Sequence, residues 1–182
     1  DAKEKGVPGE LKMKPEMVKA VCDRAHAAGY KVAAHVESPE GVKVALANGV
    51  DSIEHGAKPD DEMIRLFKEK NAFLCTTISP AVPYALFDRS LTNATEVEQY
   101  NGNIVFDGIV ECARAALAND IPVVLGNDVG CPWITQYDFW RELCYFHKYT
   151  GVSNEFALYT ATKRSAELAG IGDITGSIEK GK

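Results

Sequence analysis

The chain has 182 residues, of which 46% are hydrophobic and 25% charged, so it is long enough to bury a core of ordinary globular composition. Its formal charge of −6, without a basic cluster, argues against nucleic acids and anionic membranes as partners. No apolar run approaches the roughly 18 residues of a membrane span, and the first residues are too polar for a signal peptide. The five cysteines include no C-x-x-C pair, which favours reduced thiols and a cytoplasmic location.

Strand and helix signals alternate along the chain. Short apolar runs predict buried strands at Lys31–Val36, Val50–Glu54, Ala72–Thr77 and Ile121–Gly126. Helical spacing, with start and stop residues, predicts helices at Pro15–Gly29, Pro39–Gly49, Pro59–Lys70, Ile104–Asn119, Tyr137–Tyr149 and Asn154–Leu168. The segment from Ile78 to Asn103, which contains Pro80 and Pro83, is predicted to be a long irregular loop that binds substrate or closes over a site.

This alternation predicts βαβ units and a parallel sheet, the α/β fold class. Four such units are half of a (β/α)8 barrel or, alternatively, a small open α/β sheet, and the periodicity alone does not choose between them. The chain lacks an initiator methionine and ends in a glycine-rich stretch after residue 170. We therefore expect a fragment of a longer protein.

Histidines stand at the ends of two consecutive predicted strands. His35 lies near the end of the first, and His55 ends the second. Because the carboxyl ends of parallel strands meet at one rim, the two imidazoles should reach one metal ion, and imidazole suits Zn²⁺, Fe²⁺ or Ni²⁺. Asp128 follows the fourth strand, where it could bind metal and accept a proton from water whose pKa a metal lowers to about 7. The three residues predict metal-assisted hydrolysis, with Asp128 as the catalytic group.

Further polar residues lie near the same predicted rim, and each has an ordinary structural role as its alternative. Glu37 and Glu54 would orient a histidine ring by accepting a hydrogen bond from the ring nitrogen that does not bind the metal. Other side chains would line the substrate site: Thr76, Thr77, Tyr84 and Cys131. His26 and His147 lie on predicted helices, where surface packing or the helix dipole accounts for them.

Three stretches together resemble one family. They are AHAAGYKVAAHVESPEGVKVALANGVDSIEHG, IPVVLGNDVG and ALYTATKRSAELAGIGDITGSIEKGK. The chain resembles the amidohydrolase superfamily, in the group of imidazolonepropionase-like and Xaa-Pro dipeptidase (prolidase)-like proteins. The resemblance implies a TIM-barrel (β/α)8 fold of which only about the second half, strands five to eight, is present. Residues 1–170 would form this half-barrel, and residues 171–182 would begin the run into a flanking β-sandwich.

The resemblance also implies roles for the strand-end residues. His35 and His55 would bind one divalent metal ion, usually zinc, while Asp128 would bind a second ion and act as general base. The substrate would be a small molecule with a C–N bond to hydrolyse: an amide, a cyclic amide or an Xaa-Pro dipeptide. The family's His-x-His pair and its bridging lysine have no match in the chain, and Asn127 stands where threonine is usual. The chain alone is therefore expected to be inactive.

Two other interpretations remain open. The chain could be a non-catalytic α/β module that assembles through its exposed edges, or part of a TIM-barrel metallo-phosphoesterase. A half-barrel leaves two strand edges unpaired, so we expect association with the missing N-terminal half or with a second copy.

Overall fold

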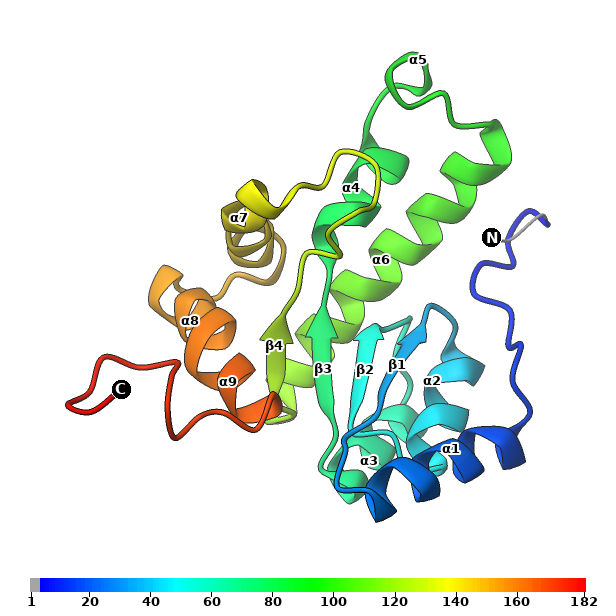
Figure 1. Cartoon of the computed structure of the whole chain (residues 1–182). Coiled ribbons are helices and arrows are strands. Elements are labelled where there is room, and N and C mark those ends of the chain that lie inside the picture. Colours follow the sequence, from blue (N-terminus) through cyan, green and yellow to red (C-terminus); the bar gives the residue numbers. More distant parts are fainter. Residues whose placement is uncertain (1–3) are drawn as a thin grey trace.

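The computed structural model describes residues 4–182, and within that range the strands form one parallel sheet. The strands follow the chain in the order β1 (Ala33–Val36), β2 (Ser52–His55), β3 (Phe73–Thr76) and β4 (Val123–Leu125). They lie side by side with their carboxyl ends at one rim (Figure 1). All the predicted strands are thus confirmed, each slightly shorter than expected.

Three helices form as predicted: α1 (Pro15–Ala27) leads into β1, and α2 (Pro39–Ala47) and α3 (Asp61–Lys70) connect the first three strands. Local chemistry explains where they begin. Ser38 accepts a hydrogen bond from the backbone N–H of Gly41 at the start of α2, and Asp60 accepts one from that of Met63 at the start of α3. These side chains satisfy N–H groups that have no partner inside the helix, which fixes the point where each helix follows its strand.

The segment from Ile78 to Asn103 was wrongly predicted as an irregular loop, whereas the helix predicted from Ile104 is confirmed as part of a longer one. The chain between β3 and β4 folds as α4 (Ile78–Leu86), α5 (Arg89–Thr92) and the long helix α6 (Glu96–Ala118). Pro80 falls in the first turn of α4, where its missing N–H costs no intrahelical bond, and most of α4 is buried. α6 begins at a reciprocal cap between Thr95 and Glu98, well before Ile104. Packing and capping therefore outweigh the prolines.

The last third of the chain is helical, as predicted. A short 3-10 turn, η1 (Gln136–Asp138), leads into α7 (Phe139–Thr150), and then α8 (Asn154–Tyr159), the π turn η2 (Thr160–Arg164) and α9 (Ser165–Leu168) follow as one run. Residues 171–182 form turns and bends, so their assignment to a β-sandwich stays a prediction. Among residues 4–182, no helix combines the length and apolar character needed to cross a bilayer.

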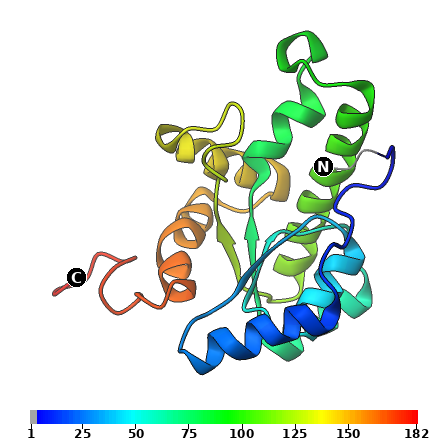
Figure 2. The ribbon, with the colours of Figure 1, turned by 45° about the vertical axis from the view of Figure 1, so that its right-hand side comes forward.

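The core lies between one face of the sheet and α2, α3 and α6 (Figure 2). Ile53, Leu74 and Val123 point to that face from three neighbouring strands and are fully buried. The helices contribute the facing apolar side chains: Val42, Leu46, Met63, Phe67, Ile109 and Cys112. Because side chains alternate along a strand, the other face receives His35, Glu54, Cys75 and Val124, which lie in register across the sheet. The second face therefore carries the polar groups.

Candidate metal centre

His35, Glu37 and His55 come together at the carboxyl ends of β1 and β2. One nitrogen of each imidazole and one carboxylate oxygen all lie within 4.8 Å of one another. The two imidazole rings are 4.6 Å apart between centroids and nearly perpendicular. His35 is exposed, Glu37 half-buried and His55 buried, so the group is open to solvent on the side of His35 and enclosed by protein on the side of His55. The predicted pair of histidines is thus brought together, and Glu37 joins them.

His55 is held from two sides. Its Nδ1 lies in hydrogen-bond contact with Oγ1 of Thr77, at the end of the next strand. Its backbone is in the left-handed region, with φ of 73°, a conformation that non-glycine residues adopt where surrounding structure compels it. Burial, and next the neighbouring His35, lower the pKa of His55. A neutral imidazole is the form that binds metal, so this environment suits a ligand.

Asp128 lies beyond β4 and stands outside the close group of three. It is exposed, its φ is 50°, and its Oδ2 accepts a hydrogen bond from the Cys131 thiol at 3.1 Å. Its position three residues after β4 places it near the carboxyl end of that strand. Its charge raises the pKa of His55, against the larger effect of burial. Burial raises the pKa of Cys131 to about 11, so this thiol is unsuited to act as a nucleophile.

The remaining predicted residues have mixed positions. Glu54 accepts a hydrogen bond from the Ser52 hydroxyl at 2.7 Å and faces the polar side of the sheet. Thr76 is fully buried, and its hydroxyl finds no hydrogen-bond partner among the described residues. Tyr84 packs on α6, where an added Cβ at Gly102 would lie 2.9 Å from the tyrosine Cβ. The orienting role of Glu54 and the substrate-lining roles of Thr76 and Tyr84 stay predictions.

The donor set fits a divalent transition metal. Two imidazoles and one carboxylate are ligand types that Zn²⁺ and Fe²⁺ accept, and three protein ligands with an open position are typical of catalytic sites. Two donors bound to one ion at about 2.0–2.2 Å lie at most about 4.4 Å apart. The three donors, all within 4.8 Å of one another, would therefore need only a small inward movement to bind one ion. The site's chemistry therefore matches a metal centre, with Glu37 as its third candidate ligand.

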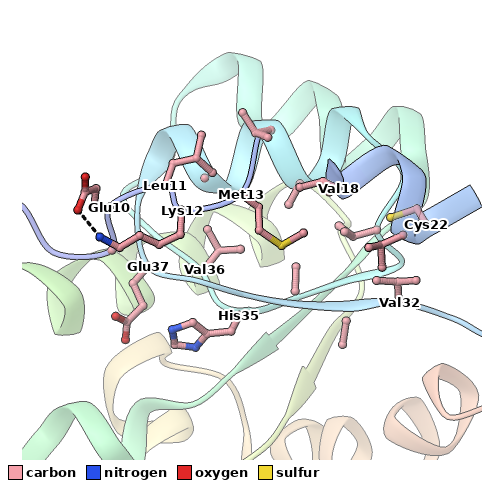
Figure 3. A pocket seen from close by; sticks show the side chains of 18 residues that line it. Glu10, Leu11, Lys12, Met13, Val18, Cys22, Val32, His35, Val36 and Glu37 are labelled. Carbon is pink, nitrogen blue, oxygen red and sulfur yellow. Dashed lines mark hydrogen bonds and ion pairs between the residues drawn. The ribbon is translucent and has the colours of Figure 1, made fainter. Parts of the chain in front are cut away.

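A cavity of about 470 Å³ opens beside β1 and ends at this group (Figure 3). His35 and Glu37 lie at one end of it, and the Glu10–Lys12 ion pair also lines it. Apolar side chains such as Leu11, Met13 and Val18 make up much of the remaining lining. His55 and Asp128 are not among its lining residues. The cavity thus follows the unpaired side of β1 rather than the carboxyl rim of the sheet, and we do not assign it as the substrate site.

Two acidic residues of interest escaped the sequence analysis in different ways. Glu37 was assigned an orienting role, but one of its carboxylate oxygens lies within 4.8 Å of a nitrogen of each histidine. Glu142 on α7 was not singled out, although it is completely buried and accepts hydrogen bonds from the first turn of α4. An acidic residue in an apolar helical pattern was the available signal for Glu142.

Gly56 forms the turn directly after His55 and offers a test of this local geometry. Its φ is 90°, and an added Cβ would lie 3.0 Å from Sγ of Cys112 and 3.1 Å from Cδ1 of Leu74. At Gly29, with φ of 82°, an added Cβ meets no described atom within 4 Å. Both alanine variants carry backbone strain, but only Gly56→Ala is also overpacked, so it should lose about 1–2 kcal/mol more unfolding free energy. Urea denaturation of both variants measures this, and equal losses would contradict it.

Parallel strands with intervening helices, and histidines at the carboxyl rim, are the architecture of TIM-barrel enzymes that assemble their active sites at strand ends. The amidohydrolase family model matches residues 6–182, and the chain belongs to that family. It is also 38% identical over 63 residues to an uncharacterized protein of Mycobacterium tuberculosis, a match spanning 35% of this chain and 17% of that protein.

Solved structures agree with the family. A protein from Bifidobacterium longum, provisionally assigned as a prolidase, is 38% identical with a TM-score of 0.91 over 96% of this chain. An Xaa-Pro dipeptidase with methionine bound in its active site is 29% identical with a TM-score of 0.82 over 97%. This chain covers 44% and 43% of those two proteins, less than half of each. The predicted fold, part of a TIM barrel of amidohydrolase type, is thereby confirmed.

Proposed function

We propose that the protein is a metal-dependent hydrolase of C–N bonds, with small dipeptides of the Xaa-Pro type as the first substrate class and other amides or cyclic amides as further candidates. One observation carries the proposal: His35, Glu37 and His55 converge within 4.8 Å at the carboxyl rim of an amidohydrolase sheet. The likeness to a provisionally assigned prolidase and to an Xaa-Pro dipeptidase supports the choice of substrate class.

Each residue then has a defined part. His35 and His55 would hold the metal, most simply zinc, and Glu37 would be the third ligand that this chain supplies. A metal bound there supplies Lewis-acid polarisation and an activated water at neutral pH. Asp128, on the same rim, would accept a proton from the attacking water and deliver it to the leaving nitrogen. Its exposure and its place beyond β4 leave the carboxylate open to solvent and substrate.

The remaining groups of the active site would come from residues outside the 182 of this sequence. Within the described range β1 and β4 each pair on one side only, so both edges can accept a further strand. We propose that the remainder of a barrel, or a second copy of the chain, covers them. Activity should therefore be measured on the full-length protein.

Replacing His35 by alanine tests the metal centre. In the full-length protein, wild type should contain divalent metal and hydrolyse dipeptides from a panel that includes Xaa-Pro. His35→Ala should lose most of both, because it removes one of two imidazole ligands. His26→Ala is the matched control and should leave the metal content unchanged. His26 contacts Asp51 at 2.8 Å, and Asp51 lies at the amino end of β2, away from the carboxyl rim. Elemental analysis and dipeptide assays provide the measurements.

The alternatives give different results in the same experiments. A wild-type protein without metal, inactive on dipeptides and cyclic amides, would exclude the hydrolase and favour the assembly module. Metal-dependent hydrolysis of phosphate esters in place of amides would favour the phosphoesterase.

A further inference from the structure

Glu142 joins two helices that are far apart in the sequence. It lies on α7 and is fully buried. Its Oε1 accepts a hydrogen bond from the backbone N–H of Ile78 at 2.8 Å, and its Oε2 accepts bonds from the N–H of Ser79 at 2.7 Å and from the Ser79 hydroxyl at 2.5 Å. The Glu142 side chain thus caps the N-terminus of α4 from a different helix, by accepting from two backbone N–H groups of its first turn.

Thr77 explains why an outside cap is useful. It is the N-cap residue of α4, and threonine normally caps a helix with its own hydroxyl. Within residues 4–182 its side chain caps no backbone N–H of α4. The hydroxyl instead contacts Nδ1 of His55. Glu142 therefore performs the capping that Thr77 does not, and the Thr77 hydroxyl remains committed to the histidine.

This contact leaves Nε2 as the imidazole nitrogen without a contact to Thr77. Metal binding through Nε2 requires the proton on Nδ1, and the Thr77 hydroxyl is placed to accept that N–H. The orientation of the ring depends on the Thr77 side chain, which leads directly into the first turn of α4. A shift of that turn would move the hydroxyl away from His55.

We propose that Glu142 is a positioning residue for the metal centre: by capping α4 in place of Thr77, it keeps the Thr77 hydroxyl on His55. The zinc-binding part of this inference rests on the proposed function. The positioning of His55 itself does not, because it concerns contacts within the metal-free protein.

Glu142→Gln and Thr77→Val test the two links in the full-length protein. Gln keeps the shape of Glu142 but replaces one acceptor oxygen by an NH₂ group facing backbone donors. Val keeps the shape of Thr77 and removes its hydroxyl. Each should weaken Zn²⁺ binding by about 10-fold, the lower end for a group that orients a metal ligand. Glu111→Gln, an exposed glutamate on α6, is the matched control and should bind Zn²⁺ as wild type does.

A double variant separates positioning from general stabilisation. If Glu142 acts through Thr77, the double variant should bind Zn²⁺ about as well as Thr77→Val alone, whereas independent effects would multiply. In the metal-free protein, ¹⁵N NMR should show His55 mainly as the Nδ1–H tautomer in wild type and as a mixture in either single variant. Ser79→Ala removes only the hydroxyl bond to Glu142 and serves if Glu142→Gln does not fold; it should shift the same tautomer balance.

The proposal is overturned if Glu142→Gln lowers thermal stability but leaves the His55 tautomer and the Zn²⁺ affinity as in wild type, because Glu142 would then only hold helices together. Multiplied losses in the double variant would overturn it as well. If wild type binds no Zn²⁺, the proposed function fails, while the NMR comparison still decides the role of Glu142.

Discussion

An Asp128→Asn variant of the full-length protein is expected to keep the metal held by the histidines and to lose most of its hydrolytic activity. The three close donors are His35, Glu37 and His55, and Asp128 lies outside that group. An amide has the shape of the carboxylate but cannot accept a proton. Removal of a general base typically costs about 10²–10⁴-fold in rate, and we expect kcat to fall within that range.

Metal content and kcat must be measured on the same preparations. The matched control is Asp107→Asn, on the exposed side of α6, which should retain both. Unchanged activity in Asp128→Asn would remove Asp128 from the reaction. A parallel loss of metal would instead make it a ligand whose carboxylate is needed to hold the ion.

Much of the fold could be predicted because its signals are local. Ser38 and Asp60 mark the starts of α2 and α3 by bonds to residues three positions ahead, and the apolar strands follow each helix at short distance. The prediction for the segment after β3 was wrong because Pro80 and Pro83 were interpreted as helix breakers. The pairing of Thr95 with Glu98 was readable as a capping signal and would have extended α6 toward its observed start.

The candidate site divides in the same way. The sequence was enough to predict that His35 and His55 lie close together, because the carboxyl ends of neighbouring parallel strands share a rim. Glu37 could not be ranked as a ligand, since it follows the last residue of β1 and its direction depends on the turn into α2. Glu142 was beyond reach for a different reason. Its partners are Ile78 and Ser79, 64 and 63 residues away, and only the packing of α7 on α4 brings them together.

Glu142 also predicts how stability depends on pH. Relative to Glu142→Gln, the wild-type protein should lose stability as pH rises. Burial raises the pKa of Glu142 from 4.5 to about 7, although its hydrogen bonds from Ser79 and Ile78 act in the opposite direction. The carboxyl group of an unfolded chain titrates near 4.5, so between these values the folded protein holds a proton that the unfolded chain has released.

The sign follows from that proton. Its stabilising contribution is fully present below pH 4.5 and is lost as pH rises through about 7. A difference of this size in pKa corresponds to about 3 kcal/mol. Urea unfolding of wild type and Glu142→Gln across about pH 5 to 8 should show the wild-type advantage shrinking or reversing by an amount of that order. Glu111→Gln should follow wild type throughout. A pH-independent difference between wild type and Glu142→Gln would mean that Glu142 stays ionised in its buried position, with its three hydrogen bonds outweighing the loss of hydration.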